Sequence, residues 1–383
     1  MGLARLGAFG LMSALAVALV LDGCTRRGAP PLTEANPPVG YVYVTNNGDG
    51  TISAFSRMAD GGLIFQRLTK AGAVDGPTGV AIHPSNRYLY VANEGNNRVY
   101  QFRIRRRNGA LMPIEGGSVA TGPASRPQHI AIVPDGRFAY VTNAGPGKGG
   151  AGSISAFTID ASTGALGLLQ TFRDSGLKQP FGIVAAPGGR FVYVSDRGAG
   201  AILSLAVQSD GTLKLQANVP SLGTKAGEPQ MIAGDNAGFV YAVDGHDGVV
   251  AVFKAGADGK LEFQKSYAVG VSTAEPMAIT LAEAGGREFA YTGNRSIDTV
   301  SYFMIQHGVM TLVGQSPTGL GGPSGMVVDP SGRYLYVVNR DAATVAQFNI
   351  VPSRNGAAML NATIFSEDPA NESSHPLYIA MTH

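Results

Sequence analysis

The amino-acid sequence predicts a seven-bladed β-propeller: it carries a sevenfold repeat, four strand-like segments in each repeat, and displaced ends. The repeat is first seen in YVYVTNNGDGTISAF at residues 41–55, where two apolar runs flank an Asn/Gly/Asp turn, which is typical of a β-hairpin. Its second aromatic residue recurs every 45 to 53 residues, at Tyr43, Tyr90, Tyr140, Tyr193, Tyr241, Tyr291 and Tyr336. A period of this length indicates a propeller or a solenoid.

Each repeat contains four segments with strand character. A short apolar run such as HIAIVP comes first, a turn of the PDGR type follows, and then come the hairpin and a last run such as DGTLKLQ. We expect four antiparallel strands, A to D from the axis outward, with turn residues at each reversal. Blades that pack face to face bury their middle strands on both sides, which explains why the B strands are continuously apolar.

The two ends of the repeat array are displaced relative to each other. The first copy begins with a B strand at Tyr41, and the chain finishes with HPLYIAMTH, which has the pattern of an A strand. The sequence therefore predicts that the C-terminal segment completes the first blade, closes the ring without a covalent link and removes exposed sheet edges.

The N-terminal region predicts export and anchoring. Residues 1–23 contain Arg5 and an apolar run of about 15 residues, which suits a secretory signal better than a membrane span. Leu21 and Gly23 before Cys24 resemble a bacterial lipobox, in which the cysteine is lipidated. The alternative is a secreted protein whose cysteine is incidental. We expect a Pro-rich tether at 24–38, a propeller at 39–383, and a lipid-anchored protein of the bacterial cell envelope that faces the periplasm or the cell exterior.

Composition restricts the partners and the chemistry. The formal net charge is +2, far from the balance of a nucleic-acid-binding protein, so no nucleic-acid partner is expected. The one basic run, FRIRRR at 102–107, is interpreted as a solvated edge, with contact to an anion as the alternative. Cys24 is the sole cysteine, which excludes disulfides, and no histidine spacing typical of a metal site occurs. We therefore expect a monomer without metal or cofactor.

One face of the propeller is predicted to carry the functional site. Strand direction places the B–C turns and the D–A connections on the same face, and the B strands end there in seven polar residues expected to line a funnel: Asn46, Asn93, Asn143, Asp196, Asp244, Asn294 and Asn339. His129 occupies a position at which other copies have a glycine, so it is either functional or a filler of the channel. The D–A connections and B–C turns bring further ionisable residues to this face: Arg126, Glu228, Glu275, His375, Glu94, Arg197, His246, Arg295 and Arg340.

The repeats resemble the lactonase-type seven-bladed propellers, which include bacterial 6-phosphogluconolactonases and fungal carboxymuconate cyclases. The resemblance rests on PDGRFAYV, GNRSIDTVSYF and VNRDAATVAQF, covers residues 38 to 383, and extends to propellers with YVTN-type repeats. It implies that His129 in RPQH corresponds to the second histidine of a Pro-His-x-His connection, and that Arg295 lies in the family's Asn-Arg turn. The next blade departs from the pattern, with QPFG at 179–182 in place of Pro-Arg-His and SDRG at 195–198 in place of Asn-Glu.

Two classes of function follow from these residues. In the first, the protein hydrolyses a lactone at the polar face: His129 activates water, Arg295 and Arg197 hold a carboxylate or the developing oxyanion, and Glu228 or Glu275 orients the imidazole. The signal sequence argues against the cytoplasmic sugar phosphate 6-phosphogluconolactone itself. In the second, the protein is a non-catalytic propeller that binds a ligand or another envelope protein.

Overall fold

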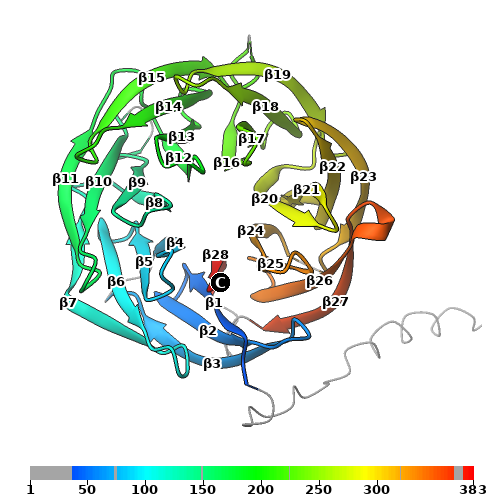
Figure 1. Ribbon diagram of the computed structural model, residues 1–383, viewed down its shortest axis with the longest axis horizontal. Coiled ribbons are helices and arrows are strands. Elements are labelled where there is room, and N and C mark those ends of the chain that lie inside the picture. Colours follow the sequence, from blue (N-terminus) through cyan, green and yellow to red (C-terminus); the bar gives the residue numbers. More distant parts are fainter. Residues whose placement is uncertain (1–36, 73–75, 148–149, 224, 320, 366–373) are drawn as a thin grey trace, which may run out of the picture.

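The computed structural model describes residues 37–72, 76–147, 150–223, 225–319, 321–365 and 374–383. These residues form seven four-stranded antiparallel sheets arranged around a central axis (Figure 1), which confirms the predicted seven-bladed propeller. Two short 3-10 helices, η1 (Arg295–Ile297) and η2 (Pro352–Arg354), interrupt the strands. No helix in this part of the chain has the length and hydrophobicity that a membrane span requires.

The blades follow one another in chain order, and the strands of each blade are ordered from the axis outward. Blade 1 comprises β28 (Pro376–Met381), β1 (Gly40–Asn46), β2 (Thr51–Arg57) and β3 (Leu63–Lys70). Blade 2 comprises β4 (Pro77–Ile82), β5 (Tyr88–Asn93), β6 (Arg98–Ile104) and β7 (Leu111–Ala120), and blade 3 comprises β8 (Pro127–Ile132), β9 (Phe138–Asn143), β10 (Ser153–Ile159) and β11 (Leu166–Phe172).

The remaining four blades repeat this order. Blade 4 comprises β12 (Pro180–Ala185), β13 (Phe191–Asp196), β14 (Ala201–Val207) and β15 (Leu213–Pro220), and blade 5 comprises β16 (Pro229–Gly234), β17 (Phe239–Asp244), β18 (Val249–Ala255) and β19 (Leu261–Ala268). Blade 6 comprises β20 (Pro276–Ala284), β21 (Arg287–Asn294), β22 (Thr299–Gln306) and β23 (Val309–Pro317), and blade 7 comprises β24 (Pro323–Val328), β25 (Tyr334–Asn339), β26 (Thr344–Val351) and β27 (Ala357–Phe365).

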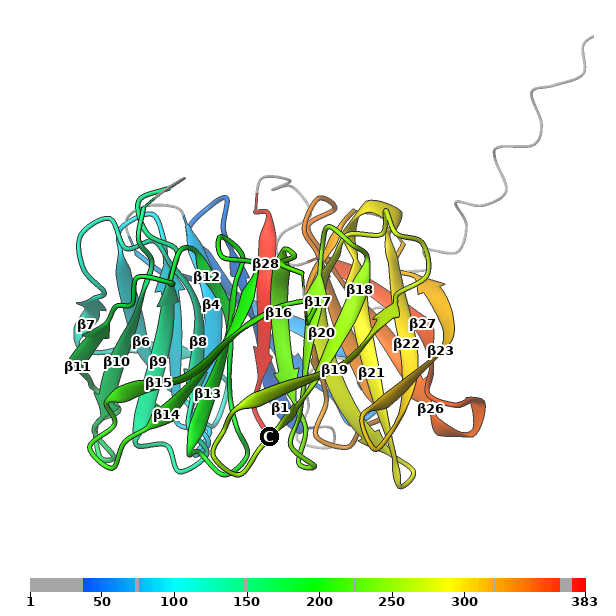
Figure 2. The same cartoon turned by 90° about the horizontal axis from the view of Figure 1, so that it is seen from above.

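The C-terminal strand closes the ring, as the sequence predicts. β28 pairs antiparallel with β1, with Val42 opposite Met381 and Val44 opposite Ile379. At the end of this ladder the Tyr41 amide donates a hydrogen bond to Thr382 Oγ1 over 2.8 Å. In the side view, β28 runs beside the axis and the C end lies at the lower edge (Figure 2).

The tyrosines that mark the repeat hold adjacent blades together. Five of the seven donate a buried hydrogen bond from the phenol to the carbonyl oxygen of a glycine in the C–D turn of the next blade, over 2.6 to 2.9 Å: Tyr43 to Gly109, Tyr90 to Gly164, Tyr140 to Gly211, Tyr291 to Gly356 and Tyr336 to Gly61. Because a buried phenol needs a partner, a tyrosine suits this position better than a phenylalanine. The period that reveals the fold in the sequence is thus a period of contacts between blades.

The inner strands approach one another closely around the axis. Each begins with a proline, and the second residue after that proline alternates in size around most of the ring: Tyr378, Gly79, His129, Gly182, Met231, Ala278 and Gly325 for blades 1 to 7. A Cβ atom on Gly79 would lie 2.5 Å from the carbonyl oxygen of Gln128 and 2.7 Å from the Cα atom of His129. The small residues therefore allow neighbouring inner strands to converge, as expected.

Replacing Gly79 with alanine tests this packing. The added methyl group meets backbone atoms of β8, which cannot move as a flexible side chain would, so G79A is expected to destabilise the protein by about 1–3 kcal/mol. Gly188→Ala is the matched control, because nothing lies within 4 Å of the Cβ position at Gly188. Thermal unfolding of both variants measures the effect. Equal unfolding midpoints for the two variants would show that β4 and β8 can move apart to admit a methyl group without loss of stability.

Candidate functional site

The B–C turns and the D–A connections lie on one face of the ring, which we call the upper face; the A–B and C–D turns form the lower face. On the upper face, the prediction of a polar funnel made by the seven B-strand ends is wrong. All seven side chains are buried. They hold the local turns: Asn46 Nδ2, for example, donates to Thr51 Oγ1 and Ser53 Oγ, and Asp244 Oδ2 accepts from the Glu228 amide. Asn and Asp occupy these positions because their short side chains cap turns.

His129 lies near the upper end of the axis and is only 6% exposed. It is the third residue of the inner strand β8, and its ring packs edge-on against Tyr378 at a centroid distance of 4.1 Å and against Phe181 at 5.2 Å. Its Nε2 atom is buried and has no hydrogen-bond partner among the described residues. Since buried polar atoms in folded proteins are nearly always satisfied, this nitrogen is available to a ligand or a water molecule.

The surroundings of His129 set its protonation state. Burial away from water disfavours the imidazolium form and lowers the pKa of His129 to about 3. The imidazole is therefore neutral at neutral pH and can accept a proton or a hydrogen bond there. It is also a weaker base than an exposed histidine.

Residues from blades 7, 1 and 4 complete an axial cluster around this histidine, which we define as His129, Phe181, Arg197, Tyr378 and Arg340. The Arg197 guanidinium lies over the Phe181 ring, 4.9 Å from its centroid. Burial raises the pKa of Tyr378, and the nearby charges of Arg197 and Arg340 act in the opposite direction. Within this cluster, Arg340 Nε is also buried and has no partner among the described residues. The cluster thus combines two cations and a protonated phenol, and two of its nitrogen atoms, His129 Nε2 and Arg340 Nε, have no hydrogen-bond partner among the described residues.

Blades 2 and 3 add a fixed carboxylate beside the cluster. Glu94, in the B–C turn of blade 2, accepts hydrogen bonds from Arg126 Nη2 over 3.2 Å and from Gln128 Nε2 over 3.1 Å. The Glu94 charge raises the pKa of Tyr378 further. Because Arg126 is paired with Glu94, Arg197 and Arg340 remain the cations that can hold an anion at this end of the axis.

The structure brings together two of the five predicted site residues, His129 and Arg197. Arg295 and Glu275 belong to blade 6 and meet each other only through the backbone, where the Arg295 amide donates to the Glu275 carbonyl over 3.1 Å. Glu228 precedes β16 of blade 5, and its side chain, like that of Glu275, is exposed. Within the described residues, no hydrogen bond or ion pair links these three to the axial cluster.

Tyr378 and Phe181 were not identified from the sequence. Tyr378 is the second residue after the proline that begins β28, which is the position that His129 occupies on β8. Phe181 is the first residue after the proline that begins β12. Aligning the seven inner strands on that proline shows Tyr378 as the one other large polar side chain at the His129 position. β4 lies between β28 and β8 in the ring and has Gly79 at the same position. Because Gly79 has no side chain, the Tyr378 ring can reach across blade 2 to the His129 ring.

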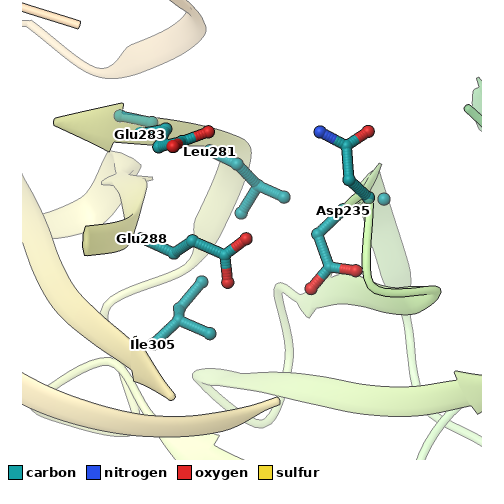
Figure 3. A pocket seen from close by; sticks show the side chains of 8 residues that line it. Asp235, Leu281, Glu283, Glu288 and Ile305 are labelled. Carbon is teal, nitrogen blue, oxygen red and sulfur yellow. The ribbon is translucent and has the colours of Figure 1, made fainter. Parts of the chain in front are cut away.

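A cavity lies at the lower face between blades 5 and 6 (Figure 3). It has a volume of about 140 Å³, and in it the Asp235 and Glu288 carboxylates face each other, with Glu283 nearby. Burial raises the pKa of Glu288, and the carboxylates of Asp235 and Glu283 add to the effect. Asp235 is committed to structure, since it accepts hydrogen bonds from the Phe239 amide and the Tyr241 phenol. In the described part of the chain no group of three His, Cys, Asp or Glu residues is placed to hold a metal ion.

Comparison with known proteins agrees with this architecture. The sequence pattern described as lactonase, 7-bladed beta-propeller, matches residues 30–180, 175–281 and 235–369. The search of curated protein sequences gives no match.

Several solved structures share the fold. A putative 6-phosphogluconolactonase from Bacteroides fragilis superimposes with a TM-score of 0.76 at 19% identity, over 93% of this chain and 100% of the other. A periplasmic gluconolactonase from Pseudomonas aeruginosa gives 0.74 at 19% identity, over 90% and 99%. A virginiamycin B lyase from Staphylococcus aureus gives 0.58 at 12% identity, over 80% and 92%. At these identities the structures support the fold alone, whereas the sequence pattern covers most of the chain, and the protein therefore belongs to the lactonase family of seven-bladed β-propellers.

Proposed function

We propose that the protein hydrolyses a lactone at the axial cluster on the upper face. The observation that carries the proposal is His129 Nε2, a buried ring nitrogen without a partner among the described residues, on a ring that contacts Tyr378 and lies in the same cluster as two arginines. Family membership adds lactone chemistry as the expected reaction class. A fold by itself would not, since propellers carry unrelated activities.

The residues of the cluster can be assigned complementary tasks. His129 Nε2 takes a proton from water as the water oxygen attacks the lactone carbonyl; the ring C–O bond then breaks, and the proton passes to the leaving alkoxide to give a hydroxy acid. The Tyr378 phenol remains protonated and can donate to the oxyanion. Arg197 and Arg340 hold a carboxylate of the substrate or product. Phe181, where the family resemblance implies an arginine, offers an apolar contact beside them.

This arrangement favours a lactone with an apolar ring and one carboxylate over a sugar phosphate. Two guanidinium groups can hold a carboxylate, and the Phe181 and Tyr378 rings match an apolar ring face better than the hydroxyl-bearing ring of a sugar. Export of the protein, which the N-terminal signal predicts, points the same way, because it separates the protein from cytoplasmic 6-phosphogluconolactone.

One observation favours the alternative of a binding propeller without turnover. A histidine with a pKa of about 3 is a weak base, and a general base works best when its pKa lies near the operating pH. The same cluster could then bind a carboxylate ligand or a segment of an envelope protein through Arg197 and Arg340.

Rates of ring opening on a panel of lactones decide between the two. The protein from residue 25 onward is suitable, since every described strand lies within it and they form the closed ring. Turnover of carboxylated lactones, faster than of neutral or phosphorylated ones, is the expected result. Binding of the same compounds, seen as a raised unfolding temperature, without turnover would overturn the hydrolase and support the binding propeller.

We also propose that the protein is anchored in the bacterial envelope through a lipid on Cys24. Cys24 lies outside the described residues, so the proposal is supported by the Leu-Asp-Gly-Cys motif after a signal-length apolar run. The similar Pseudomonas aeruginosa protein, described as periplasmic, supports a location in the envelope but says nothing of a lipid. Cys24→Ser is expected to release the protein from the membrane fraction of cells. Unchanged partition with membranes would contradict the anchor.

A further inference from the structure

Blade 2 presents four arginines at the lower face: Arg87 in the turn between β4 and β5, and Arg105, Arg106 and Arg107 in the turn between β6 and β7. All four are exposed. The two turns are adjacent, because the Ile104 amide donates to the Arg87 carbonyl over 2.8 Å. We call these four residues the blade-2 arginine patch.

The turns that carry this patch contain no carboxylate side chain. Every other blade brings at least one carboxylate to the lower face: Asp60, Asp135, Asp160, Asp210, Asp235, Asp258, Glu283 and Asp329. The two lower-face turns of blade 2, both fully described, contain neither Asp nor Glu. Among the described residues no ion pair involves any of the four arginines, whereas Arg137 in blade 3 pairs with Asp135.

The patch adjoins the point at which the chain enters the propeller. β1 begins at the lower face, and the Tyr41 phenol donates to the Arg106 carbonyl over 3.1 Å. Two apolar side chains are exposed in the same region: Val39, at 48%, and Met112, at 43%, whose sulfur lies 3.2 Å from Arg105 Nη2. The described part of the chain therefore begins beside the patch.

We propose that the blade-2 arginine patch binds the surface of a bilayer rich in anionic phospholipid. Guanidinium groups pair well with phosphates, and each basic residue near such a surface contributes on the order of 1 kcal/mol. Val39 and Met112 can enter the interface between headgroups and acyl chains. This contact holds the lower face against the membrane and turns the upper face, with the axial cluster, away from it.

The inference is independent of both proposals above, so its test uses the protein from residue 25 onward, which lacks the anchor and need not be active. Sedimentation with vesicles of phosphatidylglycerol and phosphatidylcholine measures binding, with pure phosphatidylcholine vesicles for comparison. Binding is expected on the anionic vesicles only, and it should weaken as salt is raised. The variant R105Q/R106Q/R107Q is expected to bind about 100-fold more weakly.

The matched control removes the same charge from the opposite face. Lys70, Lys178 and Lys225 are exposed near the upper face, and K70Q/K178Q/K225Q should bind like the unchanged protein. Equal losses in the two triple variants would show a general charge effect and overturn the patch, as would no binding of the unchanged protein at low salt. All six side chains are exposed, so equal unfolding temperatures check that folding is intact.

A second measurement reports orientation. The protein from residue 25 onward contains no cysteine, so Met112→Cys or Val271→Cys introduces one exposed labelling site at the lower or the upper face. An environment-sensitive dye should respond to anionic vesicles at position 112 and not at position 271. A response at position 271 alone would overturn the proposed orientation.

Discussion

A chain that ends at Ser374 is expected to unfold, or to stay folded with only a small part of the full chain's free energy of unfolding. The deletion removes β28, including Ile379 and Met381, which are buried against Val42 and Val44 of β1. Removing each large apolar core side chain costs about 2–5 kcal/mol, and a whole domain is stable by about 5–15 kcal/mol. The inner edge of β1 would also be left unpaired, which favours aggregation.

Circular dichroism and the fraction of soluble protein measure this loss. Removal of His383 alone is the matched control, because that residue is exposed and bonds only to Asn86 among the described residues. A synthetic peptide of residues 374–383 added during refolding should restore the soluble form, since the missing strand joins the ring without a covalent link. A truncated chain as stable as the full one would show that closure contributes nothing.

His129→Ala is expected to lower any lactonase rate by about 100-fold or more, because the imidazole is the proposed proton acceptor. Met231→Ala is the matched control: Met231 occupies the equivalent position on β16 in blade 5, outside the axial cluster, so its truncation removes an inner-strand side chain without removing the base. Equal rates in H129A and the unchanged protein would remove His129 from the mechanism.

The pH profile gives an independent test of the same residue. The pKa of His129 is lowered to about 3, so the acceptor stays unprotonated as the pH falls from 8 to 5, and kcat/KM should stay level over this range. An ordinary histidine would lose its acceptor below about pH 6.5. A rate that falls between pH 7 and 6 in the unchanged protein would contradict a base with a lowered pKa. If neither protein turns over a lactone, loss of ligand-induced stabilisation in H129A tests the binding propeller instead.

The sequence alone determined the fold, the number of blades and the way the ring closes. These follow from contacts that repeat: in five blades a tyrosine bonds to the next blade, as Tyr43 does to Gly109, and in four blades a small residue lets inner strands converge, as Gly79 does. Contacts that recur in each blade require similar residues at the same position of each repeat, so the sequence is periodic. Because the first repeat lacks an A strand and the chain ends with one, the sequence also predicts that β28 completes blade 1, without any knowledge of side-chain geometry.

The make-up of the site was decided by the tertiary structure, because residues on one face of a ring can lie on opposite sides of its axis. Arg295 and Glu275 share the upper face with His129 and still lie in blade 6, away from it, whereas Tyr378, 249 residues later in the chain, packs against its ring. Burial likewise made Asn46 and its equivalents structural and lowered the pKa of His129, since both effects depend on the atoms that surround a side chain and not on its place in a repeat.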